Sequence, residues 1–248
     1  MENKDQIYGS RAVIEAMESE REVEKILIQK GLQNELVKEV VRNANKYKIP
    51  VQYVPAEKLR RISTKNHQGV IGYISAVSYA SVDNIIDRAY SAGRDPFLLI
   101  LDRVTDVRNF GAIARTAECL GVDGIVIPAK GSALINADAV KTSAGALNHI
   151  PVCREASLVK LIKNLQANGI RCIALSEKGA DVLFDGELSG PIAIIMGSEE
   201  DGVSNEIIRI CDNLYQIPMT GKVESLNVSV SAGIALYEVV RHRRLNVS

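Results

Sequence analysis

Hydrophobic positions in the first 80 residues fall into short runs separated by one helix-like stretch. Three runs have the length and composition of strands, and residues 34–47 repeat apolar side chains at helical spacing. The strand-like runs cover residues 24–29, 51–55 and 69–77. Together these elements predict a small α/β unit over residues 1–77. The apolar pattern then breaks, which indicates a linker over residues 78–84, with Ser81 placed to cap a helix over residues 82–92.

From about residue 85 the chain alternates between short apolar runs and longer helix-like runs. The apolar runs are FLLILDRV, GIVIP, IRCIALSE, PIAIIMG and YQIPM. The helix-like runs are FGAIARTAECLG, ADAVKTSAGALNHI, SLVKLIKNLQANG, VSNEIIRIC and VSVSAGIALYEVVRHRR. Nearly continuous apolar strands separated by helices are typical of a parallel sheet covered on both faces. The sequence therefore predicts an α/β domain with a mainly parallel sheet over residues 85–248.

Composition narrows the class of protein. Of the 248 residues, 46% are hydrophobic and 24% are charged, as in ordinary globular proteins. No apolar run approaches the roughly 18 residues of a membrane span, and residues 1–13 lack the apolar core of a secretory signal. The cysteines are far apart in the sequence, at Cys119, Cys153, Cys172 and Cys211. We therefore expect reduced thiols in a cytoplasmic protein that binds no membrane and no metal.

The charges cancel over the whole chain but not along it. Residues 1–80 hold 13 Lys and Arg against 10 Asp and Glu, whereas residues 81–248 hold 17 against 20. Four cations stand close together without an acid between them: Lys58, Arg60, Arg61 and Lys65. Such a stretch is commonly a solvated face, and the alternative is a surface that contacts RNA phosphates.

Three polar segments carry the candidate chemistry, and each begins where a predicted strand ends. They cover residues 102–116, 194–204 and 217–233. Ligands of open α/β sheets bind outside the carboxyl ends of the strands, where such segments meet. Five polar side chains would then lie along one rim: Asn109, Arg115, Glu199, Ser225 and Asn227.

Two common nucleotide-binding motifs are missing from these segments. Neither a G-x-G-x-x-G fingerprint nor a G-x-x-x-x-G-K-[ST] loop is present. The loop with three successive acids, residues 199–201, would repel a phosphate, so the site favours a neutral or cationic ligand. Each residue alone also has a simpler role, which is helix capping for Asn109, Ser225 and Asn227 and a surface ion pair for Arg115.

Taken together, the three segments resemble the SpoU family of RNA ribose 2′-O-methyltransferases, within the trefoil-knotted SPOUT superfamily. The resemblance rests on DVRNFGAIARTAECLG, MGSEEDGVS and IPMTGKVESLNVSVSAGIALYE. YGSRAVIEAM and KNHQGVIGYIS make the first block resemble the family's accessory RNA-binding domain of ribosomal-protein L30-like fold. The two-block organisation is most similar to the bacterial members that methylate a guanosine of large-subunit rRNA.

The resemblance implies a cofactor, a topology and an assembly. S-adenosylmethionine would be the cofactor, the C-terminal chain would form a trefoil knot, and a homodimer would be built through the C-terminal domain. Backbone contacts to the cofactor are implied for Gly197, Ile217 and Leu226, with Met219, Ser225 and Asn227 beside them.

The resemblance also implies a catalytic group of Arg115, Asn109, Glu199, Asn227 and Ser225. Arg115 matches the residue proposed to accept the ribose proton. Because arginine stays protonated in proteins, the alternative is that Arg115 holds a phosphate or stabilises the developing alkoxide. The RNA partner could be rRNA, which we favour, or tRNA. A non-enzymatic RNA-binding role in ribosome assembly is the third hypothesis.

The last helix-like run has apolar and small residues around much of its circumference, more than one buried stripe requires. This pattern favours a second buried surface, and so agrees with a homodimer. The basic end of the run, residues 241–244, either complements the helix dipole or contacts RNA.

Overall fold

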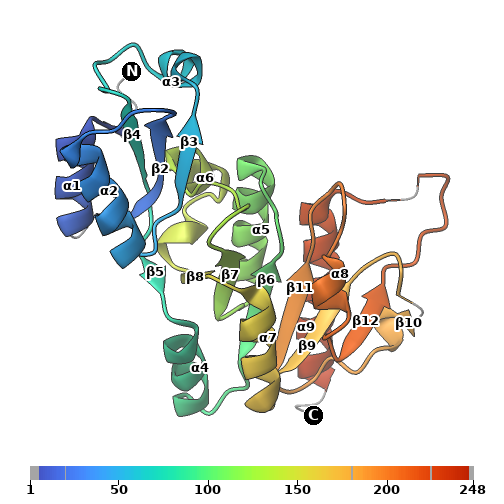
Figure 1. The fold of residues 1–248 in the computed structure, drawn as a ribbon. Coiled ribbons are helices and arrows are strands. Elements are labelled where there is room, and N and C mark those ends of the chain that lie inside the picture. Colours follow the sequence, from blue (N-terminus) through green and yellow to red (C-terminus); the bar gives the residue numbers. More distant parts are fainter. Residues whose placement is uncertain (1–5, 20, 180, 224, 246–248) are drawn as a thin grey trace. The chain divides into compact units, whose positions relative to one another are not determined.

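The computed structural model describes residues 6–19, 21–179, 181–223 and 225–245, and the chain divides into two compact units (Figure 1). The first unit comprises Met1–Ser78 and Leu134–Ala137, and the second comprises Tyr79–Ala133 and Asp138–Ser248. The short segment Leu134–Ala137 joins the first unit through Ile135. The N–H of Ile135 donates to the Glu24 carboxylate, and its carbonyl accepts from the Ala76 N–H.

The first unit is a four-stranded sheet with the order β1-β4-β2-β3. β4 runs antiparallel to β1 and β2, and β2 runs parallel to β3. The strands are β1 (Gln6–Tyr8), β2 (Val23–Gln29), β3 (Val51–Val54) and β4 (Val70–Ile74). The helices are α1 (Ser10–Glu18), α2 (Glu35–Lys46) and α3 (Ala56–Ile62). α1 and α2 pack side by side (Figure 1) and bury one face of the sheet, including Ile26, Ile28 and Val70.

Local chemistry explains where α2 begins, and α2 corresponds to the helix predicted over residues 34–47. Asn34 Oδ1 accepts a hydrogen bond from the Val37 N–H at 2.8 Å, as an N-cap does. Val37, Val40 and Ala44 then follow at helical spacing, and all three are buried. The hydrophobic pattern missed β1, which has three residues and is too short to show alternation, and it also missed α1 and α3.

The second unit is built on an eight-stranded sheet in which every described pairing is parallel. Its order is β10-β12-β9-β11-β6-β7-β8-β5. The strands are β5 (Tyr79–Ala80), β6 (Phe97–Leu101), β7 (Gly124–Pro128), β8 (Val152–Glu155), β9 (Arg171–Leu175), β10 (Asp181–Val182), β11 (Ile192–Met196) and β12 (Asn213–Gln216). The predicted α/β class with a mainly parallel sheet is confirmed.

The remaining helices cover both faces of this sheet. They are α4 (Val82–Ser91), α5 (Val107–Cys119), α6 (Ala137–Thr142), α7 (Leu158–Ala167), α8 (Asn205–Ile208) and α9 (Val228–Leu245). α4, α7 and α8 pack on one face, around Leu98, Ile100 and Ile195. α5 and α9 pack against each other, and α9 contacts β11 on the opposite face. No helix in the described ranges is long and apolar enough to cross a membrane.

The two central strands explain the apolar sequence pattern. Every residue of β6 and of β11 is buried, so neither strand needs the alternation of a half-exposed strand. Because the strands are parallel, the loops that follow β6, β9, β11 and β12 all leave the same edge of the sheet.

Three segments differ from the predicted pattern. Residues 78–84, predicted as a linker, form β5 and the start of α4, and the Ser81 side chain makes no capping hydrogen bond. The helix predicted from residue 137 stops after α6, because Ala144 and Gly145 adopt left-handed φ angles of 51° and 90°. The sequence VCRE forms β8, which the hydrophobic pattern missed.

The four cysteines are free thiols with different exposure. Cys153 and Cys172 are buried, Cys211 is half-buried and Cys119 is exposed. Burial, with smaller contributions from nearby carboxylates, raises the pKa of Cys153 and of Cys211 to about 12. Both of these thiols therefore stay protonated at neutral pH.

Candidate functional site

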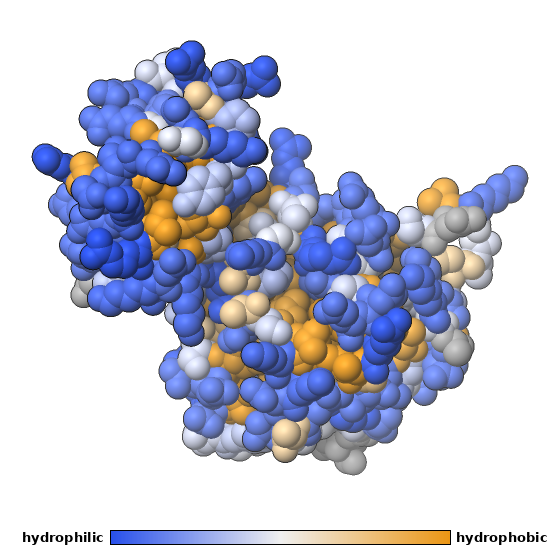
Figure 2. Space-filling view, viewed as in Figure 1, coloured by the Kyte–Doolittle hydropathy of each residue, from blue (hydrophilic) through white to orange (hydrophobic). Residues whose placement is uncertain are grey.

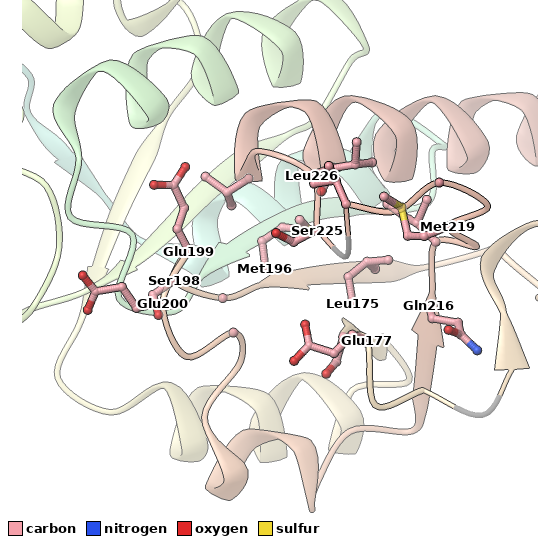
Figure 3. A pocket seen from close by; sticks show the side chains of 18 residues that line it. Leu175, Glu177, Met196, Ser198, Glu199, Glu200, Gln216, Met219, Ser225 and Leu226 are labelled. Carbon is pink, nitrogen blue, oxygen red and sulfur yellow. The ribbon is translucent and has the colours of Figure 1, made fainter.

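A cavity of about 390 Å³ opens where the chain leaves three neighbouring strands of the second unit (Figure 3). Its walls come from the ends of β9, β11 and β12, from the loops that follow them, and from the first turn of α9. The lining residues are Leu175, Ser176, Glu177, Met196, Gly197, Ser198, Glu199, Glu200, Gly202, Gln216, Ile217, Met219, Gly221, Val223, Ser225, Leu226, Val228 and Ser231. The cavity thus lies at the carboxyl edge of the parallel sheet, where the sequence analysis expected a ligand.

The walls combine apolar side chains with carboxylates. Leu175 at the end of β9 and Leu226 before α9 approach the cavity from opposite sides (Figure 3). Three glutamates also contribute to the lining, Glu177, Glu199 and Glu200, although the Glu200 side chain points away from the cavity (Figure 3). The described lining contains no lysine or arginine. An anionic ligand group would be repelled here, whereas an apolar ring and a cationic group would be accommodated.

At the rim of the cavity, Asn109, Glu199 and Asn227 form a closed hydrogen-bonded cluster. Glu199 Oε1 accepts from Asn109 Nδ2 at 2.7 Å and from Asn227 Nδ2 at 2.7 Å. Asn227 Nδ2 also donates to Asn109 Oδ1 at 3.1 Å. Within the described part of the chain, Glu199 Oε2 has no hydrogen bond. The cluster therefore orients a carboxylate and leaves one of its oxygens available.

The beginnings of two helices position these amides. Asp106 Oδ1 accepts from the Asn109 N–H at 2.8 Å and caps α5, so the Asn109 side chain is not needed as the cap. Asn227 Oδ1 accepts from the Ser229 N–H at 2.9 Å, and the Asn227 carbonyl accepts from the Val230 N–H. Asn227 therefore has the capping role considered in the sequence analysis and belongs to the cluster as well.

Arg103, which the sequence analysis did not select, ties the loop after β11 to the end of β6. Its guanidinium donates to Asp102 Oδ1 at 3.3 Å, to Asp201 Oδ2 at 3.0 Å and to the Gly202 carbonyl at 3.0 Å. Burial disfavours the charge, but Asp102 and Asp201 outweigh burial and raise the pKa of Arg103. Buried Asp102 also accepts from the Ser204 N–H at 2.7 Å. Asp102 and Arg103, the two residues that follow β6, thereby fix the loop after β11.

The backbone around Gly197 leaves no room for a side chain. A Cβ atom there would lie 1.9 Å from the Gly202 carbonyl carbon and 2.0 Å from the Val203 nitrogen. The loop folds back on itself at this point, since Ser198 and Gly202 exchange two backbone hydrogen bonds of 3.2 and 3.0 Å. Glycine is therefore required by the packing of the loop, and its backbone is exposed to the cavity.

The structure brings most of the predicted site residues together. The predicted site residues that line the cavity are Gly197, Glu199, Ile217, Met219, Ser225 and Leu226. Asn109 and Asn227 are connected to the cavity by their hydrogen bonds to Glu199. Arg115 is not in the lining. It is exposed on α5, six residues beyond Asn109 and so about 120° around the helix from it. The four predicted RNA contacts lie in the first unit, where all are exposed: Lys58, Arg60, Arg61 and Lys65.

One wall of the cavity, formed at the end of β9, was not predicted from the sequence. Leu175, Ser176 and Glu177 line this wall. The signal was present, because IRCIALSE ends in a polar pair just after an apolar strand, as the three selected segments do. Arg103 had no comparable signal, since two of its partners, Asp201 and Gly202, lie 98 and 99 residues away in the sequence.

Comparison with known proteins places this architecture in a family. The model of the SpoU rRNA Methylase family matches residues 96–237, and that of RNA 2′-O ribose methyltransferase substrate binding matches residues 6–80. A Bacillus subtilis protein assigned to the TrmH family of tRNA/rRNA methyltransferases is 36% identical over 239 residues, covering 96% of each chain.

Two solved structures are similar over nearly the whole chain. The SpoU methyltransferase AviRb of Streptomyces viridochromogenes, in complex with the cofactor AdoMet, gives a TM-score of 0.61 at 25% identity, covering 97% of this chain and 90% of its own. The AdoMet-bound rRNA methyltransferase of Sinorhizobium meliloti gives 0.59 at 25% identity, covering 96% and 87%. The chain therefore belongs to the SpoU/TrmH family of RNA methyltransferases.

Proposed function

We propose that this protein transfers a methyl group from S-adenosylmethionine to a ribose 2′-hydroxyl of RNA, and that its target is a guanosine of large-subunit rRNA. The observation that carries the proposal is the Asn109–Glu199–Asn227 cluster at the rim of a cavity with apolar and carboxylate walls. Such a site offers a cofactor pocket and, beside it, fixed polar groups that can orient a second reactant.

The cavity suits the chemistry of S-adenosylmethionine. When bound, this cofactor supplies a methyl group on a sulfonium cation. The carboxylates of the wall favour its positive charges, and the apolar side chains suit its adenine ring. We assign backbone contacts to Gly197, Ile217 and Leu226, with Met219, Ser225 and Asn227 beside them. The AdoMet complexes of two structural relatives support this assignment.

The rim residues would prepare the ribose for attack. A 2′-hydroxyl is a weak nucleophile, so it has to be aligned and must lose its proton. Glu199 Oε2 can accept a hydrogen bond from the ribose while Asn109 and Asn227 hold the carboxylate in place. Arg115 would hold a substrate phosphate or stabilise the developing alkoxide, and Ser225 would support the cofactor loop.

We further propose a homodimer built through α5 and α9. Val230, Ile234 and Tyr237 follow at positions i, i+4 and i+7 of α9, and 49%, 36% and 57% of these side chains are exposed. The buried residues of both helices face the sheet, so this apolar stripe and exposed Arg115 lie on the outer faces of two helices in contact. A partner seated on the stripe would meet Arg115, and RNA would then contact both subunits.

The chain order is consistent with a C-terminal knot, which we also propose. β9 and β11 separate β12 from β6, yet the chain returns after β12 to pack α9 against α5, the helix that follows β6.

We propose that residues 1–77 bind RNA and that residues 85–248 carry out methyl transfer. A cytoplasmic location follows from the proposed RNA substrate.

We favour rRNA over tRNA because the two-unit organisation resembles that of family members that methylate large-subunit rRNA. The first unit supports RNA binding in general, since it matches the substrate-binding model and its exposed cations on and after α3 can contact phosphates. Those cations are Lys58, Arg60, Arg61 and Lys65. The Bacillus subtilis relative carries the family description tRNA/rRNA methyltransferase, and tRNA is therefore the second candidate.

Transfer of labelled methyl groups from S-adenosylmethionine to large-subunit rRNA, and separately to total tRNA, tests the proposal. We expect label in the rRNA, at one guanosine whose 3′-phosphodiester then resists alkaline hydrolysis. Arg115→Ala should lower turnover by about 100-fold or more and leave cofactor affinity unchanged. Arg88→Ala, which removes an exposed arginine of α4, is the matched control. Label in tRNA alone would show that tRNA is the target. Binding of rRNA without methyl transfer would favour a role as a ribosome-assembly factor.

A further inference from the structure

One face of the first unit's sheet carries two tyrosines and a lysine side by side. Tyr73 on β4 lies directly opposite Lys25 on β2 and opposite Gln6 on β1. Side chains two residues apart on a strand share a face, so Tyr8, the neighbour of Gln6 on β1, lies on this face too. We call Tyr8, Lys25 and Tyr73 the tyrosine face.

Among the residues that the structure describes, helices do not cover the tyrosine face completely. α1 and α2 bury the opposite face of the sheet. α3 covers one end of the tyrosine face, where Leu27, Leu59 and Ile71 form a small core. Tyr8 and Tyr73 pack against the edge of this core, and they and Lys25 are only half-buried. A ligand could therefore reach both aromatic rings.

Cations surround these rings. Lys65 Nζ lies 5.3 Å from the centre of the Tyr8 ring. Burial lowers the pKa of Lys25, and the positive charge of nearby Lys58 lowers it further, against a smaller opposing effect of Glu24. Glu24 directs its carboxylate to the Ile135 N–H, and Glu57, the one acid of α3, stands in its first turn before the arginines. The local field is positive and suits phosphates.

The phenol of Tyr73 is held in its neutral form. Burial raises the pKa of Tyr73 above its usual value, and proximity to Tyr8 raises it further. A deprotonated phenol would repel a polyanion, so neutral rings keep the aromatic surface compatible with one. Aromatic rings flanked by cations are the usual platform for unpaired nucleotides, because bases stack on the rings while the cations hold the backbone.

We propose that the tyrosine face binds an unpaired segment of the RNA substrate, with bases stacked on Tyr8 and Tyr73 and phosphates held by Lys25, Lys58 and Lys65. This proposal rests on the proposed RNA substrate and adds the conformation that the RNA must have. A duplex would present only its grooves and phosphates and could not stack on the rings. The contact between Lys65 and Tyr8 is no obstacle, since a cation–π contact at an exposed site is weaker than a base stack.

Anisotropy titrations of the full-length protein with a labelled single-stranded RNA, and with the same RNA annealed to its complement, test the inference. Tyr8→Leu and Tyr73→Leu should each weaken single-strand binding by about 5- to 100-fold and change duplex binding little. Tyr8→Phe and Tyr73→Phe keep the rings and should bind as the wild type does. Tyr53→Leu is the matched control, because Tyr53 is 50% exposed and pairs with Ile28 on the opposite face.

The outcomes separate this inference from the proposed function. Unchanged RNA binding by the Leu variants, or an equal loss of duplex binding, would overturn the inference that the tyrosine face binds unpaired RNA. Methyl transfer by the wild type would not be affected by either result. Failure of the wild type to methylate any RNA would instead count against the proposed function. If a Leu variant does not fold, photocrosslinking of the wild type to 4-thiouridine RNA replaces it. Adducts should then form at Tyr8 or Tyr73, and adducts only elsewhere contradict the inference.

Discussion

Arg103 combines an unfavourable backbone conformation with the hydrogen bonds that hold the loop after β11. Its φ angle is 60°, in the left-handed region, which costs a residue other than glycine about 1–2 kcal/mol. Three hydrogen bonds of its guanidinium, to Asp102, Asp201 and Gly202, offset this cost. The side chain is 36% exposed, so solvent screens its ion pairs and limits what each contributes.

Replacing Arg103 by alanine and by glycine separates the backbone from the side chain. Both variants lose the three hydrogen bonds, but only glycine relieves the backbone strain. We therefore expect Arg103→Ala to be less stable than Arg103→Gly by about 1 kcal/mol, or roughly 2–4 °C in melting temperature. Both variants should lower the affinity for S-adenosylmethionine by a similar factor of about 3 to 10. The reason is that each variant releases the loop that bears Gly197 and Glu199.

Thermal melts and calorimetric titrations of the two variants provide the measurements. Arg94→Ala is a suitable control, because Arg94 pairs with Asp123 at 2.9 Å outside the cavity lining. Equal melting temperatures for the alanine and glycine variants would show that the left-handed φ is not strained. Unchanged cofactor affinity in both would show that Arg103 does not position the loop.

At the scale of elements, the basic end of α9 is mainly a structural anchor. The Arg243 guanidinium donates to the carbonyls of Asp95, Pro96 and Gly190 at 3.1, 2.9 and 2.9 Å and lies 4.9 Å from the centre of the Phe97 ring. Burial lowers its pKa, although nearby acids oppose the shift. Because three backbone carbonyls hold the half-buried guanidinium, we assign Arg243 the structural role rather than RNA contact, the other role considered for residues 241–244.

Arg243→Met should destabilise the protein by about 2–4 kcal/mol, because three carbonyls lose a charged donor together. For a domain of this size the melting temperature would fall by roughly 5–15 °C. Arg243→Lys, with one compact ammonium in place of the planar fork, should lie between Arg243→Met and the wild type. Arg244→Met removes an exposed cation from the same turn and should change stability by less than about 0.5 kcal/mol. Equal melting temperatures for the two Met variants would contradict the anchoring role.

Elements that leave a pattern in the local sequence could be predicted, whereas contacts between residues far apart in the sequence could not. β6 and β11 were predictable because total burial leaves a continuous apolar run in the sequence. β5 and β10 have two residues each, so no periodicity can indicate them. The hydrogen bonds of Arg243 could not be predicted either, because its partners Pro96 and Gly190 are brought together only by the folded sheet.

At the scale of the whole molecule, the topology makes the site predictable in outline. Parallel strands send their loops to one edge, so three polar segments sufficed to locate the cavity and the Asn109–Glu199–Asn227 cluster. The position of Arg115 was not predictable in the same way. Helical geometry carries it about 120° from Asn109, out of the cavity of its own chain and toward the face where we propose a partner.

That partner can be tested at the apolar stripe of α9. Ile234→Asp combined with Tyr237→Asp places two charges where a dimer would bury them, and burying an unpaired charge is prohibitively unfavourable. We expect sedimentation to show the wild type as a dimer and the double variant as a 27.0 kDa monomer. The melting temperature should rise with protein concentration only in the wild type. Tyr90→Asp, at a tyrosine that is 45% exposed on α4, should remain dimeric. If Arg115 acts across the interface, the monomer should bind S-adenosylmethionine but transfer no methyl group, and a monomer with full activity would rule out a site shared between subunits.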